Sequence, residues 1–65
     1  MRIIETPIPL RELNEIREKS GADVELVFLE KVERNGIPLN VVLIRGAIPE
    51  IERFMEKLMV ARAGG

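Results

Sequence analysis

The stretch VFLEKVERNGIPLNVVLI, residues 27–44, decides the fold because it predicts a β-hairpin. Asn35-Gly36 is a strong two-residue turn signal, since both residues accept the positive φ of a type I′ turn. Apolar residues, many of them β-branched, recur on both sides of this turn. We therefore expect residues 23–34 and 37–45 to form an antiparallel pair.

A regular ladder that starts at this turn pairs Arg34 with Ile37 and Glu33 with Pro38. Pro38 then occupies a non-hydrogen-bonded position, where its missing N–H would point away from the partner strand. The same ladder gathers many apolar residues on one face, which we expect to be the core face. These are Val24, Leu26, Phe28, Val32, Leu39, Val41 and Leu43.

The other face of this predicted ladder is apolar as well. Val27 lies opposite Ile44 and Leu29 opposite Val42, and we call these four residues the apolar square. An exposed patch of this kind usually marks an association site. Charged and polar side chains surround the apolar square, and the charged ones are expected to set register and specificity. They are Glu25, Lys31, Glu33 and Asn40.

The flanking segments supply one more strand and two helices. Residues 2–5 predict a short strand, which the two prolines of Thr6-Pro7-Ile8-Pro9 end. Apolar residues every three positions predict a helix from Leu10, with Gly21 as its left-handed stop. A second apolar stripe predicts a helix that begins near Pro49 and continues to about residue 62.

The expected fold is therefore α+β in the order βαββα. A three-stranded antiparallel or mixed sheet would carry both helices on one face. We expect one small domain over residues 1–62 and a frayed tail over residues 63–65. Because no further element is left, the second sheet face would stay uncovered.

The composition narrows the classes of function. A chain of 65 residues without Cys or His lacks disulfides, thiolate metal sites and the commonest general base. We therefore expect no catalysis, no metal and no cofactor. The net charge of −1, with both signs interspersed, is a poor match for duplex DNA or a membrane surface.

Charged and aliphatic residues dominate the composition, which is typical of thermophilic intracellular proteins. The sequence contains no stretch of about 20 apolar residues that would predict a membrane span, and we expect no signal peptide before the predicted fold. We expect a cytoplasmic protein.

Two stretches, LRELNEIREKSGADVEL and VVLIRGAIPEIERFMEKL, resemble parts of a KH domain. The first is similar to the second KH helix and the strand that follows. The second is similar to the last KH strand and the C-terminal helix. The resemblance covers residues 10–62 and implies binding of single-stranded nucleic acid. A KH domain uses a GXXG loop before that helix, but Thr6-Pro7-Ile8-Pro9 stand there. Binding would rely on Arg2, Arg11, Arg17 and Arg45.

The stretch IPEIERFM, residues 48–55, has a spacing similar to the peptide box that docks on sliding clamps. Ile51, Phe54 and Met55 would be its anchors, although Ile48 replaces the usual Gln. The same spacing is also that of a helical core stripe. Both interpretations predict a helix here, but only the box requires exposed anchors.

We expect a small non-catalytic interaction protein of the regulatory or inhibitor type. It would bind another protein, or itself as a homodimer, through the apolar square Val27, Leu29, Val42 and Ile44, with Glu25 and Lys31 beside it. The alternatives are a KH-like binder of single strands and a binder of a sliding clamp through its second helix.

Overall fold

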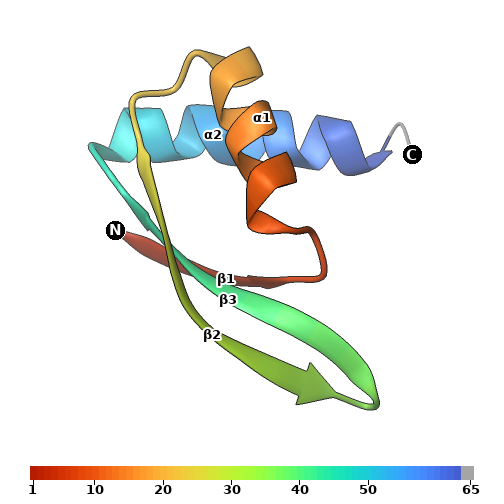
Figure 1. Cartoon of the computed structure of the whole chain (residues 1–65). Helices are drawn as coiled ribbons and strands as arrows, with labels where there is room; N and C mark the ends of the chain where they lie inside the picture. Colours follow the sequence, from red (N-terminus) through yellow and green to blue (C-terminus); the bar gives the residue numbers. More distant parts are fainter. Residues whose placement is uncertain (64–65) are drawn as a thin grey trace.

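A computed structural model describes residues 1–63, and these form the predicted βαββα order (Figure 1). The elements are β1 (Arg2–Thr6), α1 (Leu10–Ser20), β2 (Glu25–Arg34), β3 (Ile37–Arg45) and α2 (Ile48–Ala63). The expected α+β class, the three-stranded sheet and the two helices are confirmed. Of the predicted tail 63–65, Ala63 belongs to α2, and Gly64 and Gly65 lie outside the described residues.

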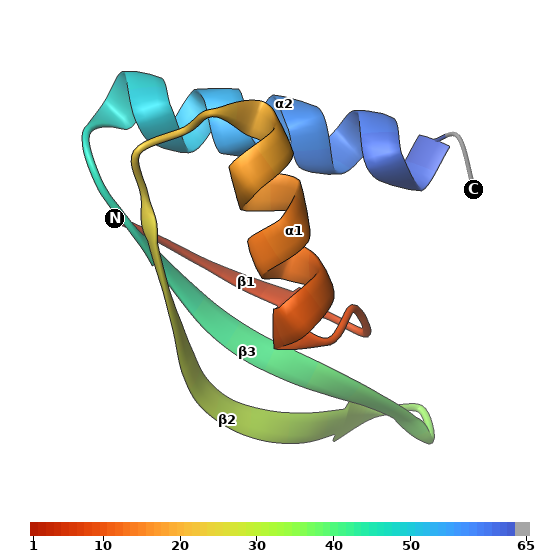
Figure 2. The ribbon, with the colours of Figure 1, turned by 45° about the horizontal axis from the view of Figure 1, so that its top comes forward.

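The sheet is antiparallel throughout, with the strand order β1-β3-β2. Asn35 and Gly36 have φ values of 53° and 80°, so the tight turn predicted from their identities is present. From this turn Arg34 pairs with Ile37 and Glu33 with Pro38, as expected. Both helices lie on the same side of the sheet (Figures 1 and 2).

The ladder between β2 and β3 contains a β-bulge that the sequence did not predict. Glu30 pairs with Val41, but Phe28 pairs with Val42, so Leu29 has no partner on β3. One extra residue on β2 shifts the register of everything beyond it by one position. Val27 consequently faces Leu43, and Leu26 faces Ile44.

Helix α1 begins and ends at the residues that its sequence indicated. Pro9 has an extended backbone before the first turn, and Gly21 closes the helix at φ 71°. In the preceding turn the buried Thr6 accepts a hydrogen bond from the backbone N–H of Ile8 on its Oγ1, at 3.2 Å. Asn40 donates from Nδ2 to the carbonyl oxygen of Ile8, at 3.0 Å, and so ties this turn to β3.

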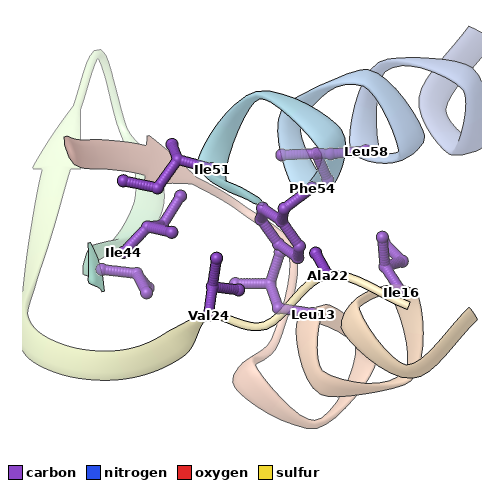
Figure 3. Close-up of a cluster of buried hydrophobic side chains, with 9 residues drawn as sticks. Leu13, Ile16, Ala22, Val24, Ile44, Ile51, Phe54 and Leu58 are labelled. Carbon is purple, nitrogen blue, oxygen red and sulfur yellow. The ribbon is translucent and has the colours of Figure 1, made fainter. Parts of the chain in front are cut away.

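The hydrophobic core lies between one face of the sheet and the two helices (Figure 3). Its largest fully buried side chains are Phe54, Leu13, Ile44 and Val42. The other buried members are Ile16, Ala22, Val24, Ile51 and Leu58. Each buried aliphatic or aromatic side chain contributes about 1.5–3 kcal/mol to folding, so this cluster holds both helices on the sheet.

The start of α2 is held against the segment before β2. The backbone N–H of Asp23 donates to Glu50 Oε1 at 2.9 Å. A Cβ atom on Gly46 would lie 3.0 Å from the carbonyl oxygen of Asp23 and 3.1 Å from Val24 Cγ1. The close approach of these two backbones therefore favours glycine at position 46, since a side chain there would require its neighbours to shift.

Because of the bulge, only some of the residues predicted for the core face lie on it. Val24 and Leu26 do pack on the core, as expected. On β3, however, the even-numbered Val42 and Ile44 point into the core, and both are fully buried. Phe28 pairs with Val42 but remains 45% exposed. The residues displaced to the other face are Val32, Leu39, Val41 and Leu43.

Candidate interaction surface on the open sheet face

The sheet face that points away from both helices carries apolar side chains from all three strands. The register aligns Ile3 of β1, Leu43 of β3 and Val27 of β2 in one row. Leu39 and Val32 form another row nearer the turn, and Val41 lies between the two rows. We call this set the open sheet face: Ile3, Val27, Val32, Leu39, Val41 and Leu43.

None of these six residues belongs to the core cluster or to the partly buried side chains packed against it. Ile3 is 60% exposed, while Val27, Val32, Leu39 and Leu43 are half-buried by their neighbours on the sheet. Within residues 1–63 no helix covers this surface (Figure 2). An apolar sheet face without a helix on it was predicted and is present. The residues that form it differ from those of the predicted apolar square.

Val42 and Ile44 were predicted to form half of the apolar square, and this prediction is wrong. Both side chains point toward the helices and are fully buried, and the bulge at Leu29 places them on the same face as Leu26 and not on that of Val27. Val27 does lie on the open sheet face, opposite Leu43 rather than Ile44. Leu29 is 46% exposed at the bulge itself.

An ion pair crosses the open sheet face from one edge strand to the other. Arg34 of β2 donates from Nε and Nη2 to the two carboxylate oxygens of Glu5 on β1, at 3.1 and 2.9 Å. These hydrogen bonds lower the pKa of Glu5 from its ordinary value, and they raise the pKa of Arg34. Glu5 is the β1 partner of Val41, which lies on the same face and is 8% exposed.

A second ion pair lies at the opposite end of this face. Glu25 and Arg45 are register partners at the end of the hairpin near α2, and their side chains approach to 3.4 Å between Oε1 and Nη1. Glu25, predicted to flank the binding surface, does lie beside Leu43 and Val27. Lys31 is exposed on β2 beyond the bulge, on the sheet face opposite to Val32.

The residues proposed for sliding-clamp binding are part of the core. Phe54 is fully buried and Ile51 is 6% exposed, and both contact the central cluster (Figure 3). Met55 packs against the same cluster. The helical core stripe therefore explains this spacing, and the clamp-box prediction is wrong because its anchors are not accessible.

The arginines suggested for nucleic-acid binding are dispersed over the molecule. Arg2 pairs with Ile44 and so lies on the helix-covered side of the sheet, whereas Arg45 lies on the open sheet face. Arg11 is exposed in the first turn of α1, and Arg17, near the end of α1, donates to Asn14 Oδ1 at 3.4 Å. The four guanidinium groups are not gathered on one surface.

Ile3 is a surface residue that the sequence analysis did not identify. Two adjacent β-branched residues, Ile3 and Ile4, occupy β1, and alternation sends one to each face of the sheet. Ile4 packs on the core, which leaves Ile3 on the open sheet face. Knowing that β1 pairs with β3 would have been sufficient to find it.

The part of the chain that the structure describes contains neither a candidate metal site nor a helix that could span a membrane. In residues 1–63 no group of three or more acidic side chains is placed to hold a metal ion. Across the same residues, neither helix has the length and apolar character that a membrane crossing requires.

Comparison with known proteins assigns a family. The comparison with curated proteins finds no match, and the comparison with solved structures finds none either. One family model, described as "Uncharacterised protein", matches residues 1–65, which is the full length of the chain. The chain therefore belongs to this family, CHP_AF_0576.

Proposed function

We propose that this is a small non-catalytic protein that binds another protein through the open sheet face. The observation that carries the proposal is an apolar surface on three strands with no layer of described structure packed on it. Apolar sheet faces are normally covered, because burying them is the main favourable term in folding. An uncovered one indicates a surface that is completed by association.

The size of the face suggests a modest interface. A strand of nine residues such as β3 is roughly 30 Å long, and three strands are roughly 14 Å wide, which gives a footprint of about 400 Å². Specific interfaces commonly bury about 800 Å² on each partner. Binding would therefore depend on a few side chains, such as Leu43 of the middle strand and its row neighbours Ile3 and Val27, with loops of the partner adding area at the rim.

The charges on the face indicate the chemistry of the partner. Arg34 is paired with Glu5, and Arg45 is paired with Glu25, so both cations are compensated within the chain. A polyanion would have to compete with these carboxylates for the two arginines. The expected partner is a protein that offers a flat apolar surface and few charges. The alternative of single-stranded nucleic acid gains no support from the dispersed arginines.

Photo-crosslinking from defined positions tests the proposal. A photoreactive amino acid at Val27 would be compared, in cells that produce the protein, with the same amino acid at Met59 on the exposed side of α2. The captured protein would then be purified and its affinity measured with unlabelled protein. We expect crosslinks from position 27 to one partner and none from position 59.

Two matched substitutions, each replacing an exposed apolar residue by Glu, show whether binding depends on the open sheet face. Ile3 and Met59 are both exposed apolar residues, at 60% and 71%. Ile3→Glu should weaken partner binding at least about tenfold, since it places a charge within the apolar row beside Leu43. Met59→Glu should leave the affinity unchanged. Equal loss with both variants, or crosslinks from position 27 to other copies of this chain alone, would overturn the proposal.

A further inference from the structure

The part of β2 beyond the bulge is an open sheet edge. In the strand order β1-β3-β2, β2 has β3 on one side, and within residues 1–63 no strand lies on its other side. Residues Glu30–Arg34 extend from the bulge to the turn, and all of them are exposed except the half-buried Val32. This arm of the hairpin projects away from both helices (Figures 1 and 2).

The turn decides which backbone groups of this edge are free to pair. In a hairpin with a two-residue loop, the residues that flank the loop form a hydrogen-bonded pair, here Arg34 with Ile37. Alternation then directs Val32 and Glu30 toward β3. The N–H and C=O groups of Lys31 and Glu33 point outward, toward the side where no strand lies. They are available to a further antiparallel strand.

The side chains of this segment form a charge pattern that is complementary to its own reverse. The sequence from residue 30 to residue 34 is Glu-Lys-Val-Glu-Arg. When two copies run antiparallel with Val32 opposite Val32, each Lys31 meets a Glu33 and each Glu30 meets an Arg34. Every charged residue of the segment therefore faces the opposite charge. Opposite charges on directly facing residues stabilise a sheet, and like charges destabilise it.

We propose that β2 pairs with β2 of a second copy of this chain, antiparallel about a two-fold axis at Val32. The register that matches the charges also matches the backbone, because its hydrogen-bonded pairs are Lys31 with Glu33 of the second copy. The two-fold symmetry gives the same pair twice, so four backbone hydrogen bonds form.

Neighbouring registers are disfavoured by the same charges. Shifting the axis by one residue places Lys31 opposite Lys31, or Glu33 opposite Glu33, at the centre of the pair. Charged residues and bulges on an edge strand generally prevent unspecific pairing. Here the charges disfavour the two shifted registers and favour the register with Val32 at the axis. The bulge at Leu29 ends the straight segment of β2 that can pair.

Pairing at this edge would join the two sheets into one of six strands. Val32 lies on the open sheet face, so the open faces of both copies would meet at the axis and form one continuous surface. The Glu30 carboxylate of the second copy would join the Arg34–Glu5 ion pair that is already present. The proposal does not rest on partner binding, since it uses the edge of β2 and not its apolar face.

Sedimentation equilibrium of charge variants tests this pairing. Lys31→Glu opposes two carboxylates at both symmetry-related positions, and Glu33→Lys opposes two ammonium groups. Each single variant should raise the dimer dissociation constant at least about tenfold. The double variant Lys31→Glu/Glu33→Lys restores opposite charges and should return the constant to within about threefold of the wild-type value.

An equimolar mixture of the two single variants provides the most specific result. Lys31→Glu and Glu33→Lys chains should form a heterodimer, although neither forms a homodimer at the same concentration. Lys19→Glu on α1 makes the same change in net charge far from β2 and should leave dimerisation unaffected. Ile3→Glu should also leave it unaffected, which separates this proposal from the one on partner binding.

Three outcomes would overturn the pairing. The first is a wild-type chain that stays monomeric at millimolar concentration and low salt. The second is a double variant as weak as the single variants, and the third is a mixture without heterodimers. Raising the salt concentration should weaken the wild-type dimer, because the four ion pairs at the axis are exposed.

Discussion

The two halves of the β2–β3 hairpin differ more than their similar sequences suggest. In the half near the helices, Val42 and Ile44 are fully buried on one face while Val27 and Leu43 lie on the other. In the half near the turn, no residue of either face belongs to the core cluster, and β2 carries charges of both signs. One unpaired residue, Leu29, separates the two halves.

This comparison shows how a bulge allows one strand to serve two surfaces. Before the bulge, even-numbered residues of β2 such as Leu26 point toward the helices. After it, the even-numbered Val32 points to the open sheet face. A continuous alternation would have kept Val32 on the same face as Leu26. The bulge instead places apolar residues of both halves on the open sheet face.

The largest expected effect comes from truncating equivalent side chains in the two halves. Ile44→Ala should lower the free energy of unfolding by about 2–5 kcal/mol, because it leaves a cavity in the core. Ile37→Ala, at a residue that is 55% exposed in the outer half, should cost less than about 1 kcal/mol. Urea unfolding followed by circular dichroism measures both. Equal losses would show that the two halves are not energetically distinct.

An intermediate effect is expected from the glycines at the two ends of β3. Gly46→Ala should cost about 1–3 kcal/mol, because the new Cβ would press on the Asp23 carbonyl and Val24. Gly36→Ala has open space around it but retains φ 80°, so it should cost about 1 kcal/mol. Thermal unfolding of both variants shows which substitution costs more stability. If Gly46→Ala left the stability unchanged, this would refute the close approach at the α2 end of β3.

The smallest effect concerns the ion pair that crosses the open sheet face. The pKa of Glu5 is lowered in the folded state, so the folded protein binds this proton more weakly than the unfolded chain does. The pair therefore stabilises above the unfolded pKa, ordinarily about 4.5, and this contribution is lost as pH falls through the lowered folded value.

Glu5→Gln removes this titration. The variant should be slightly less stable than wild type at pH 7, and the difference should shrink as pH is lowered through the folded pKa. Urea midpoints at several pH values report it. The pair is exposed, so the difference is small at any pH. A difference that grows on acidification would contradict the assigned ion pair.

Most of the fold was predictable because its signals are local. Asn35-Gly36 specifies a turn through the φ values that these two residues accept, and Gly21 stops α1 for the same reason. The register next to the turn could be derived from the position of this turn, and it places Pro38 where a proline is tolerated. Such features depend on a few neighbouring residues and need no knowledge of the rest of the chain.

The composition of the binding surface was not predictable in full, because it depends on the bulge. Phe28-Leu29-Glu30 contains no glycine or proline that would indicate an interrupted ladder. A shift of one residue exchanges the faces of a whole strand, so Val42 and Ile44 were assigned to the wrong side. Ile3 was missed because its position requires the pairing of β1 with β3, which joins distant parts of the sequence.

Thiol accessibility tests the arrangement of the two faces most directly, since the chain has no native cysteine. Leu43→Cys and Ile44→Cys place thiols at adjacent residues of β3, one on the open sheet face and one in the core. A thiol reagent should label Leu43→Cys in the folded protein, while labelling of Ile44→Cys should be slower by about tenfold or more and limited by unfolding. Equal labelling rates, or faster labelling at position 44, would contradict the bulged register and the surface built on it.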